Sequence, residues 1–210
     1  MRILTFVTQK GGTGKSTLAA SIAIAAEEQG QRVHLLDLDP QGTLRNWRSR
    51  READAPAVDH VDAARIGAAL DALRKARIDL VVIDTAGTDT PATATAIRHA
   101  DLCLIPVRPS IVDLEASRIT VQSIIRLSRP FAFVLNHCPP GRNVRITDAG
   151  RALKTLGMAA EPPVMTRADY IDAMGLGLGV TEQNASGKAA VEIRALWRWI
   201  DRQMKEAPHG

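Results

Sequence analysis

The 210-residue sequence has few aromatic residues and only two cysteines. Aromatic side chains make up 3% of it, so aliphatic side chains must fill any sizeable core. Cys103 and Cys138 are too few for a disulfide scaffold or a C-x-x-C metal site. The sequence contains no run of 18 apolar residues, so we expect no transmembrane segment. An apolar segment follows Met1-Arg2 directly and leaves no room for a signal peptide, so we expect a cytoplasmic protein.

The bulk composition is that of a globular protein. Hydrophobic residues make up 45% and charged residues 24%, and the length suits a single domain over residues 1–210. The net charge of +4 permits nucleic-acid binding without demonstrating it. Basic residues concentrate between Arg45 and Arg51 and again near the C-terminus. The second group comprises Lys188, Arg194, Arg198, Arg202 and Lys205.

Apolar segments alternate with segments of helical character. The expected strands are 2–8, 32–37, 79–84, 101–107, 130–136 and, more weakly, 160–165. The expected helices are 15–29, 42–52, 64–76, 91–99, 112–127, 145–156, 167–174 and 187–206, with a flexible connection at 175–179. The strand segments are nearly continuous apolar runs, which is typical of parallel strands buried on both faces. The pattern predicts an α/β fold with a doubly wound, mostly parallel sheet.

A glycine-rich segment, Lys10 to Thr17, lies between the first expected strand and the first expected helix. This context is typical of a phosphate-binding loop, whose backbone N–H groups form an anion site at the helix N-terminus. Lys15 would reach the β- and γ-phosphates, and the Ser16 hydroxyl would ligate Mg²⁺. The common loop pattern has glycine where this sequence has Gln9, and a second lysine, Lys10, begins the loop instead.

Polar side chains follow several of the expected strands where each strand ends. Asp37, Asp39, Asp84 and Asn136 all lie at carboxyl ends, which meet at one edge of a parallel sheet and bind ligands there. Asp84 is suited to holding Mg²⁺ through water, or alternatively to capping the next helix. Asp37 and Asp39 point to the same side of an extended strand, and Asp37 could instead make a purely structural hydrogen bond. Asn136 suits an adenine edge or an Asx turn.

The two-lysine loop, K-G-G-x-G-K-[ST], resembles the deviant Walker A motif of the ParA/MinD family of P-loop ATPases. Four other segments resemble motifs of that family in the same order. They are Val33–Gly42 (D-x-D-P-Q-G), Leu80–Thr85 (Walker B), Leu104–Ser110 (a proline-containing strand end) and Phe133–Asn136 (the adenine-side strand). The resemblance extends from Met1 to about Asn136 and implies a P-loop NTPase that hydrolyses ATP with Mg²⁺.

The resemblance also implies roles for individual residues. Lys10 would cross the interface of an ATP-sandwich homodimer and contact the partner's nucleotide, as an arginine finger does. Asp39 would orient the attacking water, with Lys10 and Lys15 completing the catalytic set. The implied Mg²⁺ residues are Ser16, Asp37 and Asp84. The implied ATP-binding residues are Lys10, Gly11, Gly12, Thr13, Gly14, Lys15, Ser16, Thr17, Asn136 and Thr166.

The family resemblance further implies non-specific DNA binding in the ATP state. It would place the protein on the nucleoid, where a ParB-like or other adaptor stimulates hydrolysis and the cycle partitions or positions DNA or a large protein cargo. The implied DNA-binding residues are Arg167, Lys188, Arg194, Arg198 and Arg202. For the other basic group, Arg45, Arg48, Arg50 and Arg51, the alternative interpretation is a solvated helix face.

Other branches of the same fold require sequence features that differ from those present. A MinD-like membrane switch would need a short basic amphipathic tail. The chain ends at Ala207-Pro-His-Gly210 without one, although Trp197 and Trp199 keep this alternative open. An iron–sulfur protein is disfavoured because both cysteines follow the Walker B strand. A small-molecule ligase is disfavoured by Lys10 and by the D-x-D-P-Q-G motif.

Overall fold

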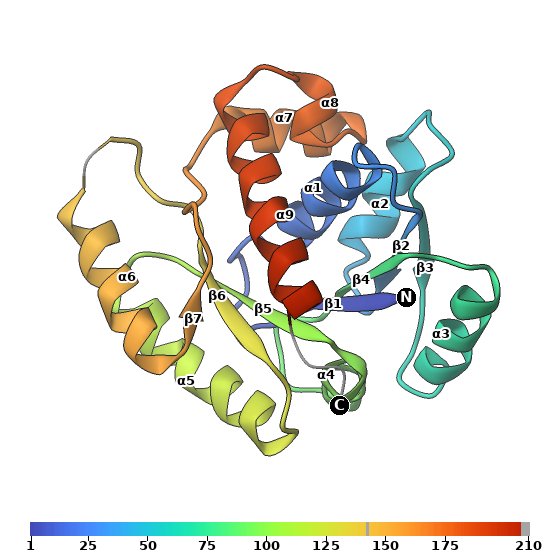
Figure 1. Ribbon diagram of the computed structural model, residues 1–210, viewed down its shortest axis with the longest axis horizontal. Helices are drawn as coiled ribbons and strands as arrows, with labels where there is room; N and C mark the ends of the chain where they lie inside the picture. Colours follow the sequence, from blue (N-terminus) through green and yellow to red (C-terminus); the bar gives the residue numbers. More distant parts are fainter. Residues whose placement is uncertain (142, 207–210) are drawn as a thin grey trace.

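The computed structural model describes residues 1–141 and 143–206. Within these ranges, seven strands form one sheet in the order β3-β2-β4-β1-β5-β6-β7 (Figure 1). The strands are β1 (Arg2–Phe6), β2 (Val33–Asp37), β3 (Ala57–His60), β4 (Leu80–Asp84), β5 (Leu102–Val107), β6 (Phe131–Leu135) and β7 (Met158–Ala159). All neighbours pair in parallel, so the predicted doubly wound α/β fold is confirmed.

Helices cover both faces of the sheet. They are α1 (Lys15–Glu27), α2 (Thr43–Arg50), α3 (Ile66–Lys75), α4 (Pro91–His99), α5 (Ile111–Arg126), α6 (Val144–Leu156), α7 (Ala168–Leu176), α8 (Val180–Gln183) and α9 (Lys188–Glu206). Figure 1 shows α9, drawn in red, beside α1 on one face. None of these helices, over the ranges described, is both long and apolar enough to cross a membrane.

Successive residues of the central strands pack into different cores. In β4, Leu80 and Val82 join the core formed with α1 and α9, whereas Val81 and Ile83 join the core under α3. All four side chains are fully buried. This is why the strand is a continuous apolar run rather than an alternating one.

The edge strand β3 is not among the strands predicted from the sequence. Its four residues are exposed or half-buried, and Asp59 and His60 interrupt any apolar pattern. Short, charged strands are common at sheet edges because they discourage pairing with other chains. The second edge strand is β7, Met158–Ala159, and the predicted position at 160–165 is wrong. Pro162 and Pro163 in that segment cannot donate ladder hydrogen bonds.

The glycine-containing stretch at 175–179 is the end of α7 followed by a turn packed against α2, and not the flexible connection expected. Helix α7 continues through Gly175, and Gly177 follows with φ 72°. A Cβ atom at Gly177 would lie 2.6 Å from the backbone carbon of Arg50. The close approach of α2 to this turn therefore requires a residue without a side chain.

Candidate nucleotide-binding site

The loop between β1 and α1 has the geometry of a phosphate-binding loop. Gly12 and Gly14 have φ values of 69° and 89°, in the left-handed region that glycine tolerates best. Helix α1 begins at Lys15, directly after Gly14. Its first backbone N–H groups and the positive end of its dipole therefore lie at the loop, where they favour an anion.

Ser16 and Asp84 meet next to this loop because β1 and β4 are neighbouring strands. The Ser16 hydroxyl donates to Asp84 Oδ2 at 2.5 Å. Asp84 Oδ1 is buried and has no hydrogen-bond partner among the described residues. Mg²⁺ takes oxygen ligands and usually keeps several waters alongside one or two protein groups. A hydroxyl beside a carboxylate with a spare oxygen therefore fits the predicted magnesium site.

Burial perturbs the two charged groups closest to the loop. It raises the pKa of Asp84 to about 7, against the effects of the Ser16 hydroxyl and Lys15. Burial also lowers the pKa of Lys15, although the carboxylates of Asp84 and Asp39 oppose this shift. Both groups are thus held in a low-dielectric setting where added phosphate and metal charges would interact strongly with them.

The raised pKa of Asp84 gives a pH-dependent prediction. Between its unfolded and folded pKa values, the folded protein holds a proton that the unfolded chain has released. The free energy of unfolding should therefore fall as pH rises from about 4 to about 7. Asp84→Asn removes this ionisation, so its Tm without Mg²⁺ or nucleotide should exceed that of wild type by about 3 °C or more at pH 8.

The measurement is a series of calorimetric melts of both proteins in EDTA from pH 4 to pH 8. Glu27 also has a raised pKa, about 7, but it contributes equally to both proteins and cancels in the difference. The Tm difference should shrink toward pH 4. Parallel curves for the two proteins across the whole range would contradict the assignment to Asp84.

The carboxylates of Asp37 and Asp39 are in different environments. Asp37 is fully buried, and its two oxygens accept backbone N–H groups of Asp39 at 3.0 Å and Arg45 at 3.1 Å. Asp39 is half-buried, and among the described residues its carboxylate accepts one hydrogen bond, from the Gln41 N–H to Oδ1 at 3.0 Å. Asp37 thus holds the turn into α2, and its place near Mg²⁺ stays a prediction. Asp39 keeps an oxygen free for water, as the predicted role requires.

Lys10 is held within its own chain. Its ammonium lies 2.9 Å from Asp113 Oδ1 at the start of α5. Ser110 caps this helix by accepting the Asp113 N–H at 3.2 Å. The Lys10 side chain remains about a third exposed, so its ammonium is also accessible from solvent.

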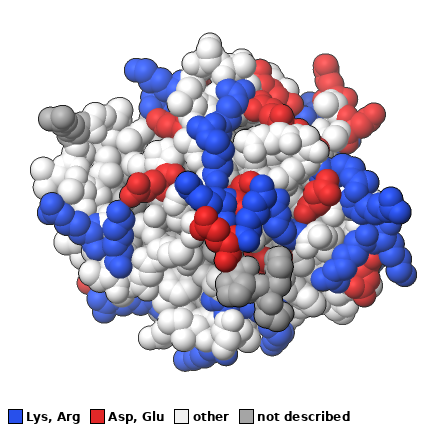
Figure 2. Space-filling model, viewed as in Figure 1, with Lys and Arg blue, Asp and Glu red and all other residues white. Residues whose placement is uncertain are grey.

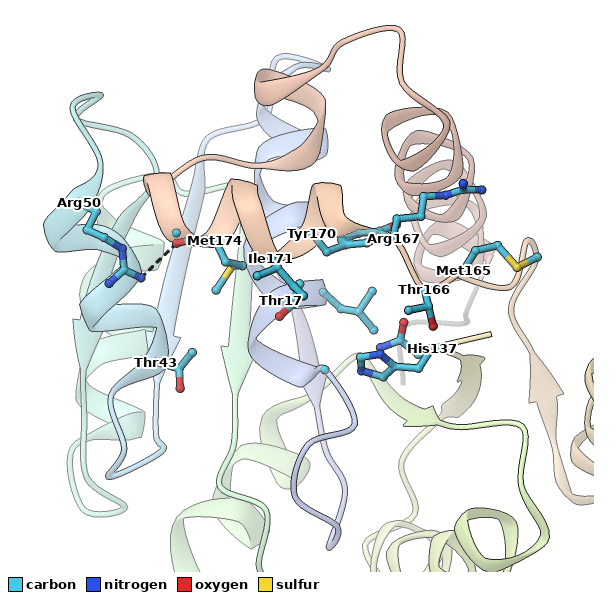
Figure 3. Close-up of a pocket in the computed structure, with 14 residues that line it drawn as sticks. Thr17, Thr43, Arg50, His137, Met165, Thr166, Arg167, Tyr170, Ile171 and Met174 are labelled. Atoms are coloured by element: carbon cyan, nitrogen blue, oxygen red, sulfur yellow. Dashed lines mark hydrogen bonds between the residues drawn. The ribbon is translucent and has the colours of Figure 1, made fainter. Parts of the chain in front are cut away.

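A pocket beside the loop has the size expected for part of a nucleotide. It has a volume of about 360 Å³, and its lining includes Gly14, Thr17, Asn136, His137 and Thr166. Figure 3 shows His137 and Thr166 at one end of the pocket and side chains of α7 along its roof. The predicted residues Asn136 and Thr166 are therefore brought to the loop, although they lie far from it in sequence. The contact of Asn136 with adenine and the contact of Thr166 with the nucleotide stay predictions.

Sequence reasoning missed Arg108, Asp113 and His137. Arg108 directly follows β5, and His137 lies two residues after the end of β6. Both could have been found by the strand-end rule that selected Asn136. His137 also has φ 53°, a left-handed conformation that non-glycine residues adopt mainly at special sites. Asp113 had no signal of its own, because only the packing of α5 brings it to Lys10.

Some of the predicted DNA-binding residues are ion-paired with carboxylates, and others are not. Arg167 is ion-paired with Glu192, and Arg194 pairs with Glu28 at 2.8 Å. Lys188, Arg198 and Arg202 are exposed on α9 and make no ion pair within 4.0 Å in the part of the chain described. Figure 2 shows basic side chains gathered along α9 at the centre of this face. We call Lys188, Arg198 and Arg202 the α9 basic surface.

The fold and the loop together define a nucleotide-binding protein of the P-loop class. The sequence matches the family described as the CobQ/CobB/MinD/ParA nucleotide binding domain over residues 4–156. This protein therefore belongs to that family, and the resemblance to the ParA/MinD ATPases is confirmed. The matched range contains the glycine loop, the three strand-end aspartates and Asn136.

Individual relatives agree with this assignment. The chain is 34% identical over 200 residues to Maintenance of carboxysome distribution protein A of Halothiobacillus neapolitanus, covering 87% of this chain and 88% of that protein. Its fold is similar to that of apo McdA from Cyanothece, with a TM-score of 0.77, 17% identity and coverage of 97% and 99%. It is also similar to the septum site-determining protein MinD of Pyrococcus horikoshii complexed with Mg-ADP, with a TM-score of 0.76, 17% identity and coverage of 96% and 96%.

Proposed function

We propose that this protein is a Mg²⁺-dependent ATPase of the ParA type, acting as one domain over residues 1–210. The observation that carries the proposal is the convergence of Lys15 with the Ser16–Asp84 pair and Asp39 at one sheet edge. The loop N–H groups and Lys15 bind the phosphates, and Ser16 and Asp84 hold Mg²⁺. Asp39 orients the water that attacks the γ-phosphorus, yielding ADP and phosphate.

The second loop lysine makes ATP part of an interface in this proposal. Two copies face each other across the loops, and Lys10 of each contacts the nucleotide of the other. A cation placed there stabilises charge that develops on the γ-phosphoryl oxygens. The 33% exposure of the Lys10 side chain at the start of the glycine loop supports this role.

The relatives support a positioning function. They include a protein named for maintaining carboxysome distribution and proteins named IncC and ParA. We infer that the ATP dimer binds DNA non-specifically through the α9 basic surface on the nucleoid. Hydrolysis separates the dimer and releases the DNA, and an adaptor on the cargo stimulates hydrolysis. Repeated cycles would distribute DNA or a large protein assembly.

The experiment that tests this proposal measures binding to non-specific duplex DNA with ATP, ADP and no nucleotide at several salt concentrations. Wild type should bind with ATP alone. The Arg198→Glu/Arg202→Glu variant should bind all sequences more weakly, and the slope of log K against log salt should flatten by about 2, because each lost phosphate contact contributes about 1. Arg74→Glu/Lys75→Glu on α3, on the other face of the sheet, is the charge-matched control.

The same assay distinguishes the membrane alternative. Trp197 is fully buried and Trp199 packs against the core, so Trp197 is not available to insert into a bilayer. Residues 207–210, where the membrane alternative would need its tail, lie outside the described residues. Binding of the ATP form to anionic liposomes but not to DNA would overturn the DNA proposal in favour of a membrane switch.

A further inference from the structure

Arg108 reaches across from the end of β5 to the phosphate loop. Its guanidinium donates through Nη2 to the backbone carbonyl of Gly12. The backbone of Arg108 is fixed on both sides, because Val107 is buried in β5 and Pro109 restricts the residue before it to extended conformations. The Ser110 N–H also donates to the Arg108 carbonyl at 2.8 Å. Arg108 therefore approaches the loop from a rigid support.

Asn136 makes the matching contact on the next peptide of the loop. Its Nδ2 donates to the Thr13 carbonyl at 2.7 Å, and the side chain is buried. Two successive carbonyl groups are thus held from outside the loop by the ends of β5 and β6. In a trans peptide the N–H points opposite to the C=O. The N–H groups of Thr13 and Gly14 are therefore turned away from these two side chains, toward the side where P-loops hold phosphate.

Arg108 lies near the Asp113 carboxylate, whose pKa it helps to lower, but unlike Lys10 it does not form a direct ion pair with it among the described residues. Within residues 1–141 and 143–206, Arg108 makes no ion pair with a carboxylate within 4.0 Å, whereas Lys10 is paired with Asp113. The buried Arg108 Nε has no hydrogen-bond partner there. A cation that donates to the Gly12 carbonyl polarises the peptide and makes the Thr13 N–H a stronger donor. It also adds positive potential at an anion site.

We propose that Arg108 is a positioning residue that holds the phosphate loop in its anion-binding conformation and thereby strengthens binding of a nucleoside diphosphate or triphosphate. Gly12 leaves room for it: a Cβ there would lie 3.2 Å from Arg108 Nη2. This inference rests on the proposed function, since the ligand is the phosphate chain that the loop is proposed to bind.

The test uses Mg-ADP and titration calorimetry, so that neither dimer formation nor DNA binding enters the measurement. Arg108→Ala should weaken Mg-ADP binding about tenfold, as expected for the loss of a charged hydrogen bond. Arg108→Lys, which keeps the charge and one donor, should recover part of the loss. The Tm of the nucleotide-free Arg108→Ala protein should stay within about 2 °C of wild type. Arg126→Ala, at the exposed end of α5, is the matched control and should bind as wild type does.

Each other outcome is informative. If wild type and Arg108→Ala bind Mg-ADP equally well, the role of Arg108 is overturned and the proposed function stands. Wild type that fails to bind Mg-ADP would overturn both. A large fall in Tm in Arg108→Ala and Arg108→Lys alike, with equal losses of affinity, would make Arg108 a general stabilising residue and also overturn the inference.

Discussion

Lys10→Ala should lose ATP-dependent dimerisation and reduce ATP turnover by about 10³-fold, while binding Mg-ADP within about threefold of wild type. The large effect on turnover follows because a cation supplied across an interface to a transferring phosphoryl group accounts for about 10³–10⁵ in rate. The small effect on ADP follows because Lys15, the loop N–H groups and the Ser16–Asp84 pair remain in place within the same chain.

The measurements are light scattering with ATP and with ADP, steady-state phosphate release, and calorimetry with Mg-ADP. Asp113→Asn is the control, because Lys10 contacts Asp113 at 2.9 Å in its own chain. If Lys10 acted only by bracing α5, removing either partner of this ion pair would give the same defect. If Lys10 acts on the partner's nucleotide, Asp113→Asn should dimerise and hydrolyse at least as well as wild type. Normal dimerisation by Lys10→Ala would refute the sandwich arrangement.

Asp39→Asn should bind ATP normally but hydrolyse it at least about 100-fold more slowly. The residue type matters because an amide cannot accept a proton from the attacking water, and positioned acid–base groups contribute about 10²–10⁴ in rate. The turn should survive the change, since the asparagine Oδ1 can still accept the Gln41 N–H as Asp39 does. The dimer should therefore accumulate with ATP and fail to dissociate.

Single-turnover hydrolysis and the lifetime of the ATP dimer check this expectation. Asp37→Asn is the contrasting variant. Both Asp37 oxygens accept backbone N–H groups in the turn to α2, and an amide can retain only one of these bonds. It should lower the Tm, whereas Asp39→Asn should leave it nearly unchanged. Wild-type turnover in Asp39→Asn would show that another group orients the water.

The parts of the site that could be predicted are those in which residue type and strand position coincide. Lys15, Ser16 and Asp84 each follow from a local pattern. Lys15 and Ser16 lie where a glycine loop meets the next helix, and Asp84 is a carboxylate at the end of a buried apolar strand, where a charged group is costly unless it binds something. The parallel sheet could be predicted in the same way. Strand β4 is buried on both faces, and its sequence, Leu80 to Ile83, is correspondingly an uninterrupted apolar run.

What could not be predicted depends on long-range packing. The ion pair between Lys10 and Asp113 joins residues 103 positions apart, and nothing near Asp113 distinguishes it from any acidic residue in the first turn of a helix. Strand β3 forms because β2 offers it a free edge, although its own side chains bury little. The glycines at 175–179 predict flexibility in the sequence, because a sequence does not show that the backbone of Arg50 lies against Gly177.

The unpaired Asp84 oxygen also bears on how strongly a bound ligand should stabilise the folded protein. Ser16 donates to Asp84 Oδ2, but the buried Oδ1 has no hydrogen-bond partner among the described residues, and such a group costs stability until a ligand satisfies it. A ligand that binds only the folded chain adds stability as RT ln(1 + [L]/Kd), about 2.7 kcal/mol at a hundredfold excess over Kd. Binding of Mg-nucleotide should therefore raise the free energy of unfolding, and the nucleotide-free protein should be degraded faster by proteases than the nucleotide-bound protein.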